Sequence, residues 1–204
     1  MNIGRFATRS LYSIIGAALC ATLWSWPAFA QDDHSHMSAA AHREQTPEQK
    51  KQASALVTAV RHATEQFRNV ENAGPDYALI FGCVSGGEFG AMGMHFLNGS
   101  LLGDGEVDVN HPEILLYEPV AHGRPQLTGA DYLVDAAEWD AKPEHKGLPP
   151  ELMGQLFHLF DAPNRFGLKA FYTLHVWAWK DNPNGTFTNW NPDVSCDGFN
   201  GLSD

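Results

Sequence analysis

Residues 171–180 read FYTLHVWAWK, and this stretch decides the fold that the sequence predicts. Successive side chains of a β-strand point to opposite faces, so the apolar residues of this stretch occupy both faces of a sheet. A strand that is apolar on both faces belongs in the middle of a sheet that is covered on each side. One histidine, His175, stands inside the run, and a buried imidazole needs a hydrogen-bond partner or a metal ion.

The chain from residue 77 onwards has the pattern of short strands separated by turns. Apolar or alternating runs are bounded by Gly, Pro and Asn, which is typical of β-sheets. We expect an α+β fold with a mostly antiparallel sheet of about five strands, open or barrel-like. The predicted strands lie near 77–84, 92–97, 113–118, 126–134 and 170–180.

One long N-terminal amphipathic helix precedes the strands. Thr46 suits the N-cap and Pro47 the first helical position, and apolar residues follow at helical spacing over residues 53–70. These residues form one stripe, which should pack on one face of the sheet. Residues 46–204 should therefore form a single α+β domain.

The segment 136–169, between the last two predicted strands, is long and irregular. Its pattern indicates a helical turn around 150–157. Long excursions of this kind often cover one end of a binding site.

Residues 1–30 have the pattern of a secretory signal peptide. Basic residues precede an apolar run, and AFA at 28–30 has the A-x-A form of a cleavage site. A membrane anchor is the alternative, although the apolar run is short for a bilayer span. We expect a periplasmic or secreted protein with no membrane association after cleavage, starting with a disordered His-containing leader, residues 31–45.

The composition narrows the choice of partners. The chain has 13 basic and 24 acidic residues and a formal net charge of −11. Binding to nucleic acid or anionic lipid depends on Lys and Arg, so this balance argues against both partners. A small molecule or a metal ion is the partner that fits.

Cys83 and Cys196 stay in the chain after removal of the signal, which contains Cys20. In an oxidising compartment a disulfide between them is favoured, and its long loop could contribute roughly 4 kcal/mol. Two unlinked buried thiols are the alternative. A cysteine metal site is disfavoured because no CxxC or HxxxC spacing occurs.

Four predicted strands each carry one ionisable residue on a face that is otherwise apolar. A buried carboxylate is costly unless it is paired, hydrogen-bonded or bound to a cation, so the four groups have a reason to meet. Two imidazoles and two carboxylates suit a divalent first-row transition metal such as iron, copper or zinc. The alternative is a polar network without a metal. The four residues are His95, Glu118, Asp131 and His175.

Weaker candidates surround this group. Three tryptophans could line a pocket for a flat ligand, although core packing is the usual role of tryptophan at strand spacing. His158 could close over the cluster, and the leader could hold a metal loosely through its His and Met residues. No GxSxG, HExxH or phosphate-loop spacing occurs. The tryptophans are Trp177, Trp179 and Trp190, and the leader residues are His34, His36, Met37 and His42.

Three stretches together form a recognisable pattern along the chain. They are GAMGMHFLN (90–98), PEILLYEP (112–119) and LHVWAWKDNPNGTFTNWNP (174–192). Together they resemble a family of small secreted bacterial proteins of no established activity, over most of residues 65–196. Asp131 departs from the pattern, in which glutamate is usual, and its shorter side chain moves the carboxylate by about one bond. The resemblance supports the domain limits and implies no function. The positions in the pattern are His95, Asn98, Glu118, Asp131, His175 and Trp190.

Two functions are compatible with these features. The first is an exported metal-binding protein, with two His ligands, Asp131 or Glu118 as carboxylate ligand, and an open coordination position under residues 136–169. With iron or copper it would be an oxidoreductase acting on a small organic molecule. The alternative is a non-catalytic periplasmic binding module for a small aromatic or apolar ligand. A structural or accessory exported protein is a third possibility.

Overall fold

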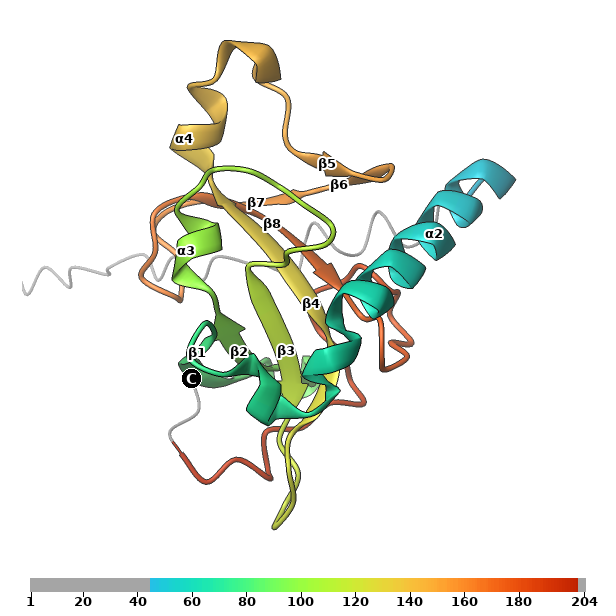
Figure 1. Ribbon diagram of the computed structural model, residues 1–204, viewed down its shortest axis with the longest axis vertical. Helices are drawn as coiled ribbons and strands as arrows, with labels where there is room; N and C mark the ends of the chain where they lie inside the picture. The colour runs from blue at the N-terminus through green and yellow to red at the C-terminus, as the bar shows by residue number, and fades with distance from the viewer. Residues whose placement is uncertain (1–44, 202–204) are drawn as a thin grey trace, which may run out of the picture. The chain divides into compact units, whose positions relative to one another are not determined.

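A computed structural model describes residues 45–201, which belong to one compact unit (Figure 1). The expected signal peptide, and the leader apart from Gln45, lie outside the described residues. The elements in chain order are α2 (Pro47–Thr64), η1 (Glu65–Arg68), η2 (Val70–Ala73), β1 (Ala78–Ser85), η3 (Gly87–Phe89), β2 (Ala91–Leu97), α3 (Gly99–Leu102), β3 (Ile114–Glu118), β4 (Gln126–Asp135), α4 (Ala136–Asp140), η4 (Pro143–His145), β5 (Glu151–Leu152), β6 (Gln155–Leu156), β7 (His158–Phe160) and β8 (Phe171–Val176).

Six strands form one antiparallel sheet in the order β1-β2-β3-β4-β8-β7. The α+β class and the mostly antiparallel sheet are therefore confirmed. The sixth strand is β7, which the sequence placed in an irregular segment. The sheet is open and not a closed barrel, since β1 and β7 are its two edges.

The strand registers place residues that are distant in sequence side by side. Ile114, Asp131 and His175 stand opposite one another in one row across β3, β4 and β8. His95 on β2 lies in the next row, opposite Leu116. Because side chains two positions apart share a face, His95, Asp131 and His175 all belong to the same face of the sheet.

Helix α2 covers the other face. Its N-cap, Thr46, forms a capping box with Gln49, which satisfies backbone N–H groups of the first turn. The buried residues Leu56 and Val60 pack against the β4 and β8 side chains that point away from the site, such as Tyr132 and Leu174. The expected packing of one long helix on the sheet is confirmed. Within the described residues, no helix has the length and apolar character needed to cross a membrane.

A bulge in β1 changes where its side chains point. The register passes from Ile80↔His95 to Cys83↔Met94, so Phe81 and Gly82 are extra residues in β1. Both have positive φ, +57° and +66°. A bulge redirects the side chains beside it, and here the ring of Phe81 lies 5.3 Å from that of Phe166.

The segment after β8 returns along β1 and β2. Cys83 and Cys196 form the expected disulfide, with Cα atoms 5.7 Å apart. Ala91 pairs with Asn191 through two backbone hydrogen bonds, and Trp190 packs in a cluster of buried residues with Met92. These contacts hold residues 189–196 against the sheet.

Two local predictions were wrong. The helical turn expected around 150–157 is a hairpin of β5 and β6, because Met153 and Gly154 both take positive φ and form the tight turn that joins antiparallel strands. The strand expected over 170–180 ends at Val176. Beyond it, the Trp177 N–H donates to Thr186 O at 2.9 Å, outside the sheet.

Gly129 stands where the β4 backbone closely approaches the end of β8. A Cβ at this position would collide with Val176 O and lie 3.2 Å from Trp177 Cα. We expect Gly129→Ala to lower the free energy of unfolding by roughly 3 kcal/mol, measured by urea denaturation. The control is Gly99→Ala, where a Cβ meets nothing within 4 Å, and it should change stability by under about 1 kcal/mol. Equal losses in both variants would contradict this role of Gly129.

Candidate metal centre

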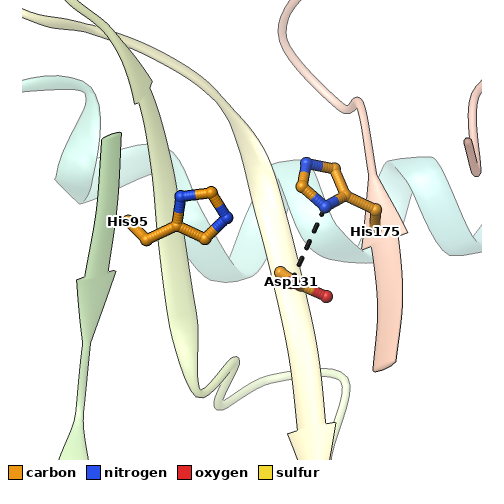
Figure 2. A group of neighbouring side chains, drawn as sticks. All are labelled: His95, Asp131 and His175. Atoms are coloured by element: carbon orange, nitrogen blue, oxygen red, sulfur yellow. Dashed lines mark ion pairs between the residues drawn. The ribbon is translucent and has the colours of Figure 1, made fainter. Parts of the chain in front are cut away.

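Three side chains from β2, β4 and β8 meet on the face opposite α2 (Figure 2). His95, Asp131 and His175 are 4%, 6% and 1% exposed. Each offers one potential ligand atom, and these atoms all lie within 4.8 Å of one another. In residues 45–201 this is the group of His, Cys, Asp or Glu side chains that could hold a metal ion. Three of the four residues singled out by strand alternation are therefore brought together.

The protonation of His95 leaves one nitrogen free for a ligand role. Its Nδ1 lies 3.1 Å from Gly93 O, and because a carbonyl oxygen only accepts, Nδ1 carries the proton. Nε2 therefore carries a lone pair, and the ring is turned so that a nitrogen faces Asp131 and His175 (Figure 2). Burial and, to a smaller extent, the neighbouring His175 lower the pKa of His95 to about 4, although Asp131 and the hydrogen bond to Gly93 O act in the opposite direction. A neutral imidazole oriented in this way is in the state that binds metals.

The carboxylate of Asp131 has one oxygen with a hydrogen bond and one oxygen without. The Thr173 hydroxyl donates to Oδ1. Oδ2 lies 3.6 Å from His175 Nδ1, which is longer than a hydrogen bond. Two atoms bound at ~2.1 Å to one tetrahedral ion are about 3.4 Å apart, so this distance is typical of two ligands of the same ion.

Closure around an ion requires a small movement. Neighbouring ligands of one ion, bound at ~2.1 Å, are about 3.0–3.4 Å apart. The three atoms of this group lie within 4.8 Å of one another, which is a wider spacing. Binding would therefore draw the atoms inward by on the order of an ångström, which small side-chain rotations supply. The donor set and its spacing fit a first-row divalent ion.

A small cavity adjoins the three residues. Its volume is about 30 Å³, and since one water needs roughly 10–15 Å³, it has room for a few atoms. Besides the three site residues, Thr173 and Asn189 are its polar wall. Most of the remaining wall is apolar and includes Phe81, Phe160, Phe166, Phe171, Leu133 and Met92.

Two buried polar atoms of this wall have no hydrogen-bond partner among the described residues: His175 Nε2 and Asn189 Oδ1. Buried polar atoms are nearly always paired, and the exceptions mark sites where something else binds. Strand alternation could not identify Asn189, because this residue lies in a turn-rich segment. Its signal is visible only in three dimensions.

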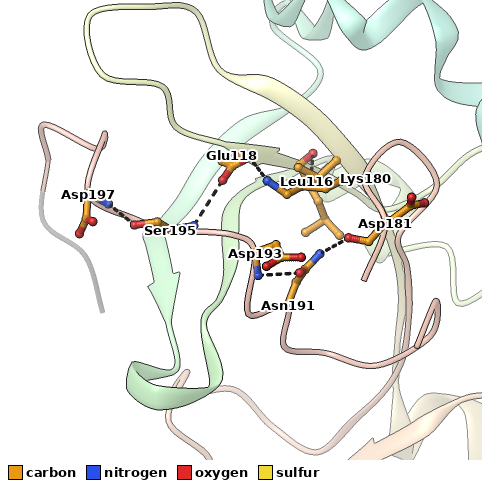
Figure 3. Close-up of polar contacts among 9 residues, drawn as sticks. Leu116, Glu118, Lys180, Asp181, Asn191, Asp193, Ser195 and Asp197 are labelled. Carbon is orange, nitrogen blue, oxygen red and sulfur yellow. Dashed lines mark hydrogen bonds and ion pairs between the residues drawn. The ribbon is translucent and has the colours of Figure 1, made fainter. Parts of the chain in front are cut away.

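Glu118, the fourth residue expected in the group, lies elsewhere (Figure 3). Its Oε2 accepts a hydrogen bond from Lys180 Nζ at 2.6 Å, and its Oε1 is 3.4 Å from the Ser195 backbone N–H. The carboxylate is thus neutralised by a lysine on the segment that follows β8. The structure does not bring it to His95 and His175, because Glu118 ends β3 and a register shift between Leu116 and Tyr117 separates it from the row of Asp131.

The residues expected to line a ligand pocket are dispersed and lie outside the cavity wall. Trp177 donates from Nε1 to Thr188 O at 2.6 Å, and its ring is 4.9 Å from that of His175. Trp179 donates to Thr64 Oγ1 at 2.9 Å, on the side of α2. Trp190 packs with Val84 and Met92. His158 is exposed on β7, where it pairs with Thr173 through the backbone.

The segment 136–169 divides into two parts. Its second part contributes Phe160, Phe166 and Leu168 to the cavity wall. In its first part, Ala136 and Leu152 pack in the cluster of α2 instead. The leader residues His34, His36, Met37 and His42 lie outside the described residues.

A buried carboxyl group next to the site was missed by the sequence analysis. Glu113, directly before β3, is 2% exposed, and its Oε2 accepts from the Leu133 backbone N–H at 3.0 Å. Burial raises the pKa of Glu113 to about 8. The backbone hydrogen bonds oppose this shift, and the negative charges of Asp131 and Asp104 add to it. Glu113 precedes the first residue of β3, and its side chain accepts the hydrogen bond from Leu133 that a backbone carbonyl of a longer β3 would accept.

Comparison with known proteins gave no match to a family model, to a curated protein or to a solved structure. The resemblance to an uncharacterised secreted family therefore stays a prediction.

Glu113 should make stability fall as the pH rises. Its pKa is about 8 in the folded chain and 4.5 in the unfolded chain, so above pH 4.5 the folded state binds the extra proton and the stabilisation is lost toward pH 8. Between pH 6.5 and 8 the loss should be about 1.5 kcal/mol, measured as unfolding free energy in urea. His95 acts in the opposite sense below pH 6.5, where the unfolded state binds the extra proton.

The variant Glu113→Gln keeps the hydrogen bond from Leu133 and cannot ionise. We expect its stability to be flatter over the same pH range. A wild-type slope that persists in this variant would show that another group titrates.

Proposed function

We propose that this chain is an exported metalloprotein that holds one divalent first-row transition metal ion through His95 Nε2, the Asp131 carboxylate and His175. The observation that carries the proposal is the orientation of His95. Its Nδ1–H donates to Gly93 O, which leaves the Nε2 lone pair directed at a buried carboxylate and a second imidazole. Two imidazoles and one carboxylate on one side of an ion form the donor set of non-haem iron sites and also suit zinc, manganese and copper.

Charge balance supports the same proposal. Asp131 is buried, and a neutral His95 supplies no charge to compensate it. A buried carboxylate without a cation costs several kcal/mol, whereas a divalent ion converts this cost into binding energy. The Thr173 hydroxyl then serves as the outer partner that orients the ligating carboxylate.

The cavity suggests what the ion would act on. Three protein ligands leave coordination positions open, and the cavity is the space beside them. Its phenylalanine walls disfavour charged molecules, which would lose their hydration without compensation. With iron or copper, the proposed activity is an oxidation or reduction of a small organic molecule, to which the ion supplies Lewis acidity and electron transfer.

Metal analysis of purified protein without a histidine tag tests the proposal. We expect about one equivalent of bound metal, lost in His175→Ala and in Asp131→Asn and retained after deletion of residues 31–44. Thr173→Val should keep the stoichiometry and weaken affinity by roughly tenfold to a hundredfold, because only the outer hydrogen bond is removed.

The matched control is His62→Ala, which removes an exposed histidine of α2 and should leave binding unchanged. The proposed site would be refuted if the bound metal were lost on deletion of residues 31–44, or if it were retained in His175→Ala.

The second candidate function, a binding module for a small apolar ligand, has the apolar wall of the cavity in its favour. The Trp177 ring lies 4.9 Å from His175, so its fluorescence should report occupancy of the cavity. In the binding-module case, metal-free protein would show a saturable fluorescence change with small apolar molecules, and Leu133→Trp would abolish it by filling the cavity. Under the metal proposal we expect no such change in metal-free protein.

A further inference from the structure

Asn189 is a buried amide beside the metal group that no described residue pairs with. It is 6% exposed, it lines the same cavity as His95, Asp131 and His175, and its Oδ1 has no hydrogen-bond partner in residues 45–201. Leaving a buried acceptor unpaired costs about 1–3 kcal/mol. Because Asn189 also lines a cavity with room for a few atoms, this unpaired oxygen points to a bound donor there.

The backbone around Asn189 is fixed on both sides. Thr188 O accepts from Trp177 Nε1 at 2.6 Å, and Trp190 O accepts from Asn182 Nδ2 at 3.0 Å. Asn191 is paired with Ala91 of β2. The backbone that carries the Asn189 amide is therefore held in place by its neighbours.

The protein groups of the cavity wall do not satisfy this oxygen. The Thr173 hydroxyl already donates to Asp131, and His95 Nδ1–H donates to Gly93 O. His175 Nε2 also lines the cavity and is itself unpaired. The apolar side chains have no donors, so the missing partner is not among residues 45–201.

We infer that Asn189 accepts a hydrogen bond from a small neutral O–H or N–H donor, with water as the simplest case, bound on the open side of the metal ion. The inference rests on the proposed metal site and adds a residue that selects its ligand. A carbonyl oxygen attracts a donor and repels an anion, so Asn189 favours neutral donors over hydroxide and halide-like anions. Asn189 is a positioning residue for the ligand and does not bind the ion itself.

Cobalt-loaded mature protein provides the test, because the visible absorption of Co²⁺ changes when a bound water loses a proton. Asn189→Leu removes the acceptor that favours neutral water, and we expect the midpoint of the absorption change to move down by about one pH unit. Asn189→Asp adds a negative charge that opposes hydroxide, so the midpoint should move up by a similar amount. Both variants should still bind one equivalent of Co²⁺.

The control is Asn184→Leu, an exposed asparagine of the same segment, which should leave the midpoint unchanged.

If Asn189→Leu fails to fold, as judged by circular dichroism, the upward shift in Asn189→Asp decides the question alone. Normal cobalt loading with unshifted midpoints in the folded variants overturns the inference and leaves the metal site standing. Loss of cobalt in folded Asn189→Leu overturns it as well, since Asn189 would then be a ligand. Wild-type protein that binds no metal refutes the proposed function, and the inference falls with it.

Discussion

The constraint on which the site depends is the burial of a carboxylate in an apolar sheet face. Asp131 is 6% exposed and stands in one row with Ile114 and His175. Its oxygens have a hydroxyl donor from Thr173 and an imidazole nitrogen at 3.6 Å. One hydrogen bond offsets only part of the desolvation of an anion, and a cation within bonding distance offsets far more. The two histidines therefore matter because they could supply nitrogen ligands to a cation beside this carboxylate.

The sheet explains why these groups meet. The antiparallel order β2-β3-β4-β8 brings residues 95, 131 and 175 to one face, although they are far apart in the chain. Helix α2 fills the other face with aliphatic packing, so the site face stays open for the cavity. The Cys83–Cys196 disulfide and the Ala91–Asn191 pairing then hold the last segment over β1 and β2, which carries Asn189 to the cavity. The three candidate ligands thus lie on strands, whereas Asn189 lies on a loop that the disulfide and the Ala91–Asn191 pairing attach to the sheet.

Strand alternation predicted His95, Asp131 and His175 because the period of two applies wherever one face is buried. It was wrong about Glu118, since alternation does not show where a strand ends or whether a lysine such as Lys180 stands nearby. Asn189 and Glu113 lie outside regular strands, so strand alternation cannot predict to which side their side chains point. The hairpin at Met153 and Gly154 could have been predicted from its glycine, whereas the apolar residues beside it also fit a helical turn. Side-chain pairing across loops depends on tertiary contacts that a single sequence does not contain.

The cavity limits the chemistry more strongly than the ligands do. Two imidazoles and a carboxylate give a divalent ion a net charge of about +1, and an apolar wall does not screen that charge. At the proposed site, a further ligand would therefore be either an anion that neutralises the ion or a neutral molecule that an additional acceptor stabilises. The only polar wall groups beyond the ligands are Thr173, whose hydroxyl is committed to Asp131, and Asn189, whose free oxygen opposes an anion. In the proposed metal site, the remaining acceptor among the described wall residues is therefore Asn189, which would favour small neutral donors beside the ion.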